Sequence, residues 1–138
     1  MNLIRLIFLT LLISNPLPAV QVEGVDRNNL KPVSIISLIA NPQMHDGEFV
    51  QVEGFCQFGL EESTIYLSQD DAHFLNYKNG LHLQFSEKLV KQVNSRKFNQ
   101  KFVLIEGIFK PEKIQPTWGT MGSLIQITRI ELEHRADY

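Results

Sequence analysis

The chain has 138 residues, 43% of them hydrophobic, so it can bury one core but is too short for two ordinary domains. Its formal net charge of −2 argues against a strongly basic protein that coats nucleic acid. Cys56 is the one cysteine, which excludes a disulfide within the chain.

Residues 1–19 have the layout of a secretory signal peptide. Arg5 gives a basic start, residues 6–13 (LIFLTLLI) are apolar, and SNPLPA ends in small or turn-forming residues. Eight apolar residues are far fewer than the ~20 that a membrane-spanning helix needs. We therefore expect export, cleavage after Ala19, and no transmembrane anchor once the signal is removed. An exported chain without a disulfide suits a bacterial periplasm, so the expected location is periplasmic or secreted.

Residues 20–32 (VQVEGVDRNNLKP) lack a hydrophobic period and are expected to form a flexible leader before a domain at 33–138. Charge is distributed unevenly over the remaining chain. Residues 20–77 hold nine acidic and two basic side chains, whereas residues 78–138 hold six acidic and ten basic ones. If the fold keeps these two halves apart, the molecule has an acidic pole and a basic pole.

The first half of the domain is predicted to hold a helix and two strands. Ser34 can cap a short, mostly apolar helix that ends at Asn41-Pro42 and that should plug or cover the core. Residues 48–58 alternate as a strand until Gly54, where a bulge or sharp coil is expected. A second strand, TIYLS, is predicted with Ile65 and Leu67 facing inward and with Thr64 and Tyr66 facing outward.

The second half is predicted to hold two helices and three strands. Ser68, with an acid three residues later, forms a capping box that starts one or two helical turns. Residues 81–86 (LHLQFS) alternate as a strand, and Ser86 can cap the helix that follows. In that helix Leu89, Val90 and Val93 are expected to face the core. The last two strands are predicted at 101–111 and 123–133.

Two of the predicted strands share nearly the same phrase, EFVQVEGFCQF at 48–58 and KFVLIEGIFKP at 101–111. A small barrel needs coiled strands to close, so a glycine after two inward aliphatic residues suits both segments. Five strands with a helix between the third and fourth is the connectivity of the OB-fold, in which the first and fourth strands are neighbours. We therefore predict a mainly β protein, a five-stranded OB-fold-like Greek-key barrel with an additional N-terminal helix.

The segment from Ile35 to Glu133 resembles a group of small bacterial exported proteins with an OB-fold, mostly uncharacterised. The resemblance rests on LIANPQMHDGEFVQVEGF, IYLSQDD, NGLHLQF, KFVLIEGIFKP and MGSLIQITRIEL. These motifs consist of turn glycines and core residues, so the resemblance implies a fold and no catalytic signature.

The predicted binding surface combines one barrel face with one long loop. Tyr66, His82 and Gln84 are expected on the outer face of the second and third strands. The loop at 111–122 frames that face and contains Trp118 and Met121, side chains that bury much area when a partner binds. Trp118 folding back over the open end of the barrel is the equal alternative. The five residues are the predicted partner-binding set.

Three other interpretations stay open. Asp70, Asp71 and His73 could ligate a metal and support a hydrolase, although the acids are also explained as favourable charges at a helix start. Glu53 and Glu106 could form a carboxylate pair, although solvated positions on the outer face are the plainer account. The basic residues around 88–101 could bind an oligonucleotide or another anionic polymer, although a solvated helix face is the plainer account of them.

The sequence thus predicts an exported, non-catalytic binding module that recognises a protein partner or a small ligand, without a cofactor or metal. A toxin-neutralising protein or a modulator of an envelope enzyme is one concrete version. A metal-dependent hydrolase is the runner-up, and nucleic acid is the less favoured partner.

Overall fold

The structure, a computed structural model, describes residues 19–21, 26–59, 62–112 and 119–133. Five strands close into a barrel in the order β3, β4, β5, β7 and β6, with β6 returning to β3. The β5–β7 pair is parallel and the other four pairs are antiparallel. Their bounds are β3 Phe49–Phe58, β4 Ser63–Tyr66, β5 Gly80–Leu83, β6 Lys101–Pro111 and β7 Gly122–Leu132. The predicted mainly β class and barrel are confirmed.

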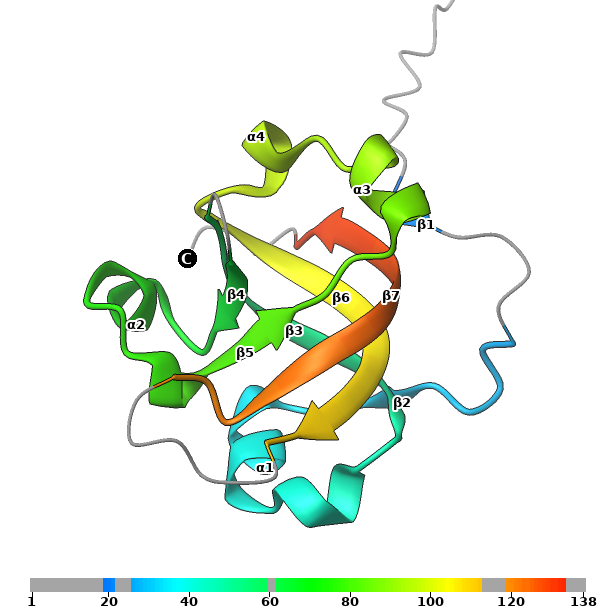
Figure 1. Cartoon of the computed structure of the whole chain (residues 1–138), viewed down its shortest axis with the longest axis vertical. Coiled ribbons are helices and arrows are strands. Elements are labelled where there is room, and N and C mark those ends of the chain that lie inside the picture. Colours follow the sequence, from blue (N-terminus) through cyan, green and yellow to red (C-terminus); the bar gives the residue numbers. More distant parts are fainter. Residues whose placement is uncertain (1–18, 22–25, 60–61, 113–118, 134–138) are drawn as a thin grey trace, which may run out of the picture.

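Short helices surround the barrel, with α1 at one end, α3 and α4 at the other, and α2 at its side (Figure 1). Serine side chains cap three of them. Ser34, Ser68 and Ser86 each accept a hydrogen bond from the backbone N–H three residues later, as predicted for helix starts. The bounds are α1 Ile35–Ala40, η1 Pro42–His45, α2 Gln69–His73, η2 Tyr77–Asn79, α3 Glu87–Gln92 and α4 Ser95–Phe98.

The twin phrases lie side by side as β3 and β6, as predicted. Their pairing is antiparallel and centred on Val52 opposite Ile105. Because one phrase runs backwards relative to the other, Gly54 lies opposite Val103 and Gly107 lies opposite Val50. Each glycine therefore faces an aliphatic residue of the other strand.

The two glycines serve different needs. A Cβ on Gly54 would lie 2.6 Å from the backbone oxygen of Tyr66, so β3 and β4 approach too closely there for any side chain. Gly107 lies at a register shift between β6 and β7, opposite a segment in which Gln126 has a φ of +47°. The first glycine permits close approach, and the second belongs to a bulge.

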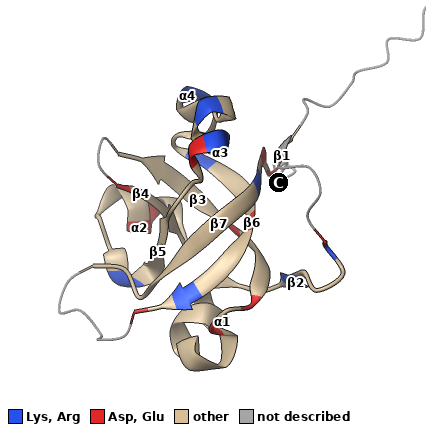
Figure 2. Cartoon of the chain, turned by 45° about the vertical axis from the view of Figure 1, so that its right-hand side comes forward, with Lys and Arg blue, Asp and Glu red and all other residues tan. Residues whose placement is uncertain are grey.

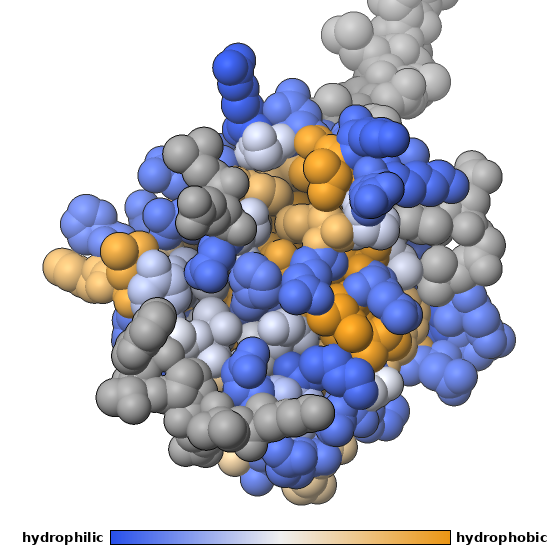
Figure 3. All heavy atoms as spheres, in the orientation of Figure 1, coloured by the Kyte–Doolittle hydropathy of each residue, from blue (hydrophilic) through white to orange (hydrophobic). Residues whose placement is uncertain are grey.

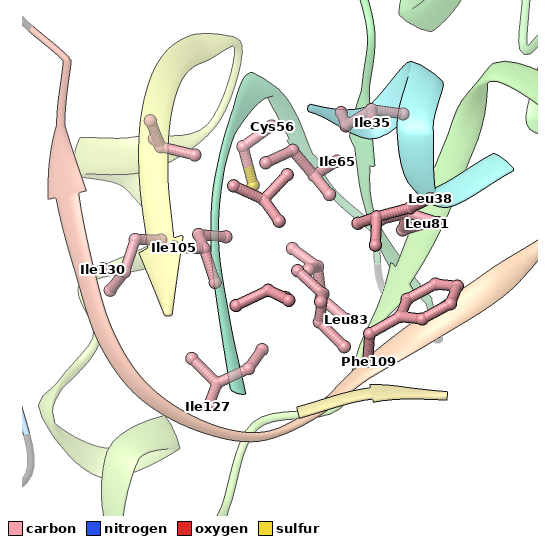
Figure 4. Close-up of a cluster of buried hydrophobic side chains, with 14 of the residues drawn as sticks. Ile35, Leu38, Cys56, Ile65, Leu81, Leu83, Ile105, Phe109, Ile127 and Ile130 are labelled. Carbon is pink, nitrogen blue, oxygen red and sulfur yellow. The ribbon is translucent and has the colours of Figure 1, made fainter. Parts of the chain in front are cut away.

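The barrel interior is filled by aliphatic side chains from all five strands (Figure 4). Helix α1 closes one end, because Ile35 and Leu38 are buried in the same cluster. At the other end Leu89 of α3 and Phe98 of α4 are buried. The prediction that the first helix covers the core is confirmed.

The segment after Ser86 differs from the single helix that was predicted. It forms α3 and α4, separated at Val93 and Asn94, which have extended backbone. Leu89 is buried as expected, but Val90 is 57% exposed, so its predicted core position was wrong. The break turns the chain so that Phe98 of α4 reaches the core. Helix α3 therefore buries Leu89 and leaves Val90 exposed.

The outer face of β4 is covered by the chain's own α2–η2 segment. Tyr66 is only 1% exposed and packs with Phe55 and Ala72, with Tyr77 and Phe102 at the edge of this second cluster. Thr64 and Tyr66 thus lie on the outer side of β4, as predicted, but they are buried there, so the expectation that Tyr66 is exposed for binding was wrong. Leu67, predicted to face inward, is exposed because β4 ends at Tyr66.

The end of α2 carries exposed apolar side chains, visible at the left edge of Figure 3. Phe74 is 77% exposed, and Leu75 follows it with a φ of +53°. These side chains lie on the outside of the segment that buries Tyr66.

Residues 20–32, expected as a leader, contribute two short strands in their described part. β1 (Val20–Gln21) pairs with β7, and β2 (Lys31–Pro32) pairs in parallel with β3. Residues 1–18, the expected signal peptide apart from Ala19, lie outside the described residues. In the portion of the chain that the structure describes, no helix has the length and apolar character needed to cross a bilayer.

Candidate binding site

A hollow of about 400 Å³ lies against the outer face of β5. His82 and Gln84 come from β5 and the residue after it, and Ser123 comes from β7, which pairs with β5 at His82. The rim is formed by loops and by η2. It consists of Glu62 before β4, Tyr77 in η2, Glu112 after β6, and Gly119 and Thr120 before β7.

The side chains around this hollow, hereafter the β5 hollow, favour a ligand that is cationic or donates hydrogen bonds. Glu62 and Glu112 supply two carboxylates, and no lysine or arginine occurs among its described lining residues. Tyr77 adds an aromatic side chain, which attracts cations through its ring face. His82 and Gln84 each have both donor and acceptor capacity, so they can fix the orientation of a polar group.

The predicted binding residues divide between this hollow and its surroundings. His82 and Gln84 line it together, as the sequence predicted for one face. Tyr66 lies instead beside a smaller crevice of about 110 Å³, which shares Glu62 and Tyr77 with the β5 hollow. Burial raises the pKa of Tyr66 to about 12.

The predicted loop residues are less fully described. Trp118 lies outside the described residues. Met121 is half-buried, and its carbonyl oxygen accepts a hydrogen bond of 3.3 Å from the Glu112 backbone N–H. This bond holds together the two ends of the connection between β6 and β7, beside the β5 hollow.

Among the lining residues that were not in the predicted binding set, three carry a charged or aromatic side chain: Glu62, Tyr77 and Glu112. Each lies just outside a predicted strand, where a polar residue is ordinarily explained as part of a turn. What these residues share is a position near the end of a strand, and the ends of neighbouring strands meet at one rim of the barrel. That signal could be used only after the strand order was known.

Of the predicted Asp70, Asp71 and His73 cluster, Asp71 is engaged in local hydrogen bonds. Asp71 accepts side-chain hydrogen bonds from Ser68 at 2.6 Å and from Asn76 and Asn79 at 2.9 Å each. The Ser68 bond lowers the pKa of Asp71, and the two asparagine bonds add to this effect against the opposing effect of burial. Asp71 thereby ties η2 to the start of α2. Among the described residues, no group of three or more His, Cys, Asp or Glu side chains is arranged to hold a metal ion.

Glu106 has a position that the sequence did not predict. It is 2% exposed, whereas a solvated position was expected. Its Oε1 accepts hydrogen bonds from Arg129 at 3.0 Å, from Gln51 at 3.2 Å and from Arg27. Gln51 and Arg129 are its direct neighbours across β3 and β7, so the three form a row over the outer face of the barrel.

The leader explains this burial, because Arg27 reaches Glu106 from the segment between β1 and β2. Glu53, the equivalent glutamate of the other phrase, is exposed and lies opposite Leu104. The two glutamates therefore occupy different environments and different register positions. The carboxylate-pair interpretation is not favoured by this arrangement.

Cys56 is fully buried in the barrel interior, and burial raises the pKa of its thiol to about 12. A nucleophilic cysteine needs a depressed pKa, so this thiol serves as a small core side chain.

No family model, curated protein or solved structure matches this chain.

Proposed function

We propose that the chain is an exported, non-catalytic OB-fold module that binds a protein partner or a small ligand in the β5 hollow. The closed barrel supports the fold assignment, because its helices α3 and α4 connect the third and fourth barrel strands and its first strand pairs with its fourth. OB-folds bind ligands on the face of their second and third strands and in the flanking loops.

The observation that carries the proposal is the convergence of polar groups on one concave surface. His82 and Gln84 come from β5 and the residue after it, Glu62 and Glu112 come from two other segments, and all four line one hollow. The lining chemistry favours a ligand group such as the ammonium or guanidinium of a basic protein segment or of a small amine. A toxin or an envelope enzyme with a basic surface is a partner of that kind.

Nuclear magnetic resonance titration of the ¹⁵N-labelled protein tests the proposal. The probes are a basic peptide of lysine and glycine and an acidic peptide of glutamate and glycine of equal length. We expect the basic peptide to shift the amide resonances of His82, Gln84, Thr120 and Ser123, and the acidic peptide to leave them unchanged. Equal responses to both peptides, or shifts confined to other surfaces, would contradict the assignment.

A pair of variants sharpens the test. Glu112→Gln removes one carboxylate from the hollow, and we expect it to weaken binding of the basic peptide about fivefold, as for a rim charge worth about 1 kcal/mol. Glu87→Gln removes an exposed carboxylate from α3, away from the hollow, and should leave the affinity unchanged. Equal losses in the two variants would mean that net charge, and not the site, governs binding.

A further inference from the structure

One end of the barrel carries a concentration of positive charge. Residues 87–98, which contain α3 and α4 and are hereafter called the basic cap, hold four basic side chains and one acidic one, Glu87. Figure 2 shows blue segments on both α3 and α4 and a red one on α3. The basic residues are Lys88, Lys91, Arg96 and Lys97.

These four side chains lack the carboxylate partners that most other basic residues of the described chain have. Arg27 and Arg129 bind Glu106, Lys31 binds Glu48, and Lys110 binds Asp46. Within the described residues, no ion pair involves any basic residue of the cap. The charge of the cap is therefore available to an external anion.

The apolar groups of the cap favour a lipid surface over a nucleic acid. Val90 is 57% exposed among the lysines of α3, and Figure 3 shows aliphatic side chains beside hydrophilic ones there. Nucleic-acid binding without sequence preference uses exposed aromatic side chains as stacking platforms. The aromatic residue of the cap, Phe98, is fully buried, with the Lys97 ammonium 5.1 Å from its ring centroid. Exposed aliphatic groups flanked by basic ones are typical of surfaces that lie on an anionic bilayer.

We propose that the basic cap is a docking surface for the anionic phospholipid headgroups of a membrane. Lys88, Lys91, Arg96 and Lys97 contact the headgroups, and Val90 inserts between them. The β5 hollow lies on another part of the barrel, so it stays accessible to a partner when the cap is docked. Docking of the basic cap therefore does not depend on which ligand binds in the β5 hollow.

Vesicle partitioning of the full chain tests this proposal. The probes are vesicles of phosphatidylcholine alone and vesicles of phosphatidylcholine mixed with phosphatidylglycerol. Apolar residues 6–13 contribute equally to binding of the two kinds of vesicle. The ratio of the two partition coefficients, anionic over neutral, therefore measures the electrostatic part of the binding. We expect the wild-type ratio to be high and to approach one as salt rises from about 0.1 M to about 1 M, where the screening length falls to about 3 Å.

Two triple variants that remove equal charge locate the contact. The cap variant is Lys88→Gln, Lys91→Gln and Arg96→Gln, and the control variant is Lys31→Gln, Lys78→Gln and Lys110→Gln. All six side chains are exposed, so both variants should fold. We expect the cap variant to lower the ratio roughly 100-fold, because each basic side chain near an anionic surface contributes about fivefold. The control variant should change it much less, and Val90→Ser should weaken binding without altering its salt dependence.

Three results would overturn the proposal. The first is a wild-type ratio near one at low salt, a result that needs no variant. The second is an equal loss in the cap and control variants, which would assign binding to net charge alone. The third is displacement of the protein from the anionic vesicles by a single-stranded oligonucleotide at matched charge concentration, which would assign the cap to nucleic acid.

Discussion

Replacing Glu106 by glutamine tests how strongly one buried carboxylate stabilises the barrel. The side chain has donors on three sides: Gln51 from β3, Arg129 from β7 and Arg27 from the leader. Glutamine has nearly the same shape, so the substitution removes charge without opening a cavity. Arg129, which is half-buried, then keeps Glu131 as its remaining carboxylate partner.

The expected loss follows from burial. Breaking a buried ion pair by removing one partner costs about 3 to 5 kcal/mol, because the other charge stays in a poorly solvated place. Glutamine retains an acceptor oxygen, and the exposed side of Arg27 can turn to water, so the lower part of that range applies. We expect Glu106→Gln to lower the free energy of unfolding by about 3 kcal/mol.

The twin phrase supplies a matched control. Glu53 precedes its glycine as Glu106 does but is exposed, so Glu53→Gln should change the free energy of unfolding by no more than about 0.5 kcal/mol. Urea denaturation of the full chain at pH 7, followed by circular dichroism, measures both. Equal effects of the two substitutions would show that burial does not set how much each carboxylate contributes to stability. The double variant Glu106→Leu, Arg129→Leu should regain stability over Glu106→Gln, because it removes both charges together.

Three further predictions concern single residues. Gly54→Ala should lower the free energy of unfolding by more than about 2 kcal/mol, and by more than Gly107→Ala does. The added methyl at Gly54 would lie 2.6 Å from the Tyr66 backbone oxygen, whereas the nearest atom at Gly107 is 3.0 Å away. Urea denaturation of both variants measures the two losses, and the reverse order would contradict the close approach of β3 and β4 at Gly54. Asp71→Ala should cost about 1 kcal/mol at pH 7. The pKa of Asp71 in the folded protein lies below its ordinary value of 3.8, so this stabilisation is complete above about pH 4 and is lost as the pH falls through the folded pKa. If the wild type remained more stable than the variant in strong acid, the prediction would be contradicted. Cys56 should react with a thiol reagent only after denaturation, since burial raises its pKa to about 12; prompt labelling of the native protein would show that the site is open.

The positions of the strands, the helix starts and part of the site follow from local patterns in the amino-acid sequence. β6 spans Lys101–Pro111, as predicted, and β3 begins one residue after the predicted start. Alternation and serine caps are local signals, because a strand's two faces and a helix's first free N–H groups depend only on nearby residues. His82 and Gln84 were placed on one face for the same reason.

Which outer faces stay exposed depends on how distant segments pack against the barrel. Tyr66 and Glu106 both point away from the barrel interior, yet α2 covers one and the leader covers the other. Alternation distinguishes the two sides of a strand, but it cannot tell whether a distant segment will fold back over the outer side. The same holds for the rim of the β5 hollow, where Glu62, Tyr77 and Glu112 meet only because the barrel brings three separate chain segments together.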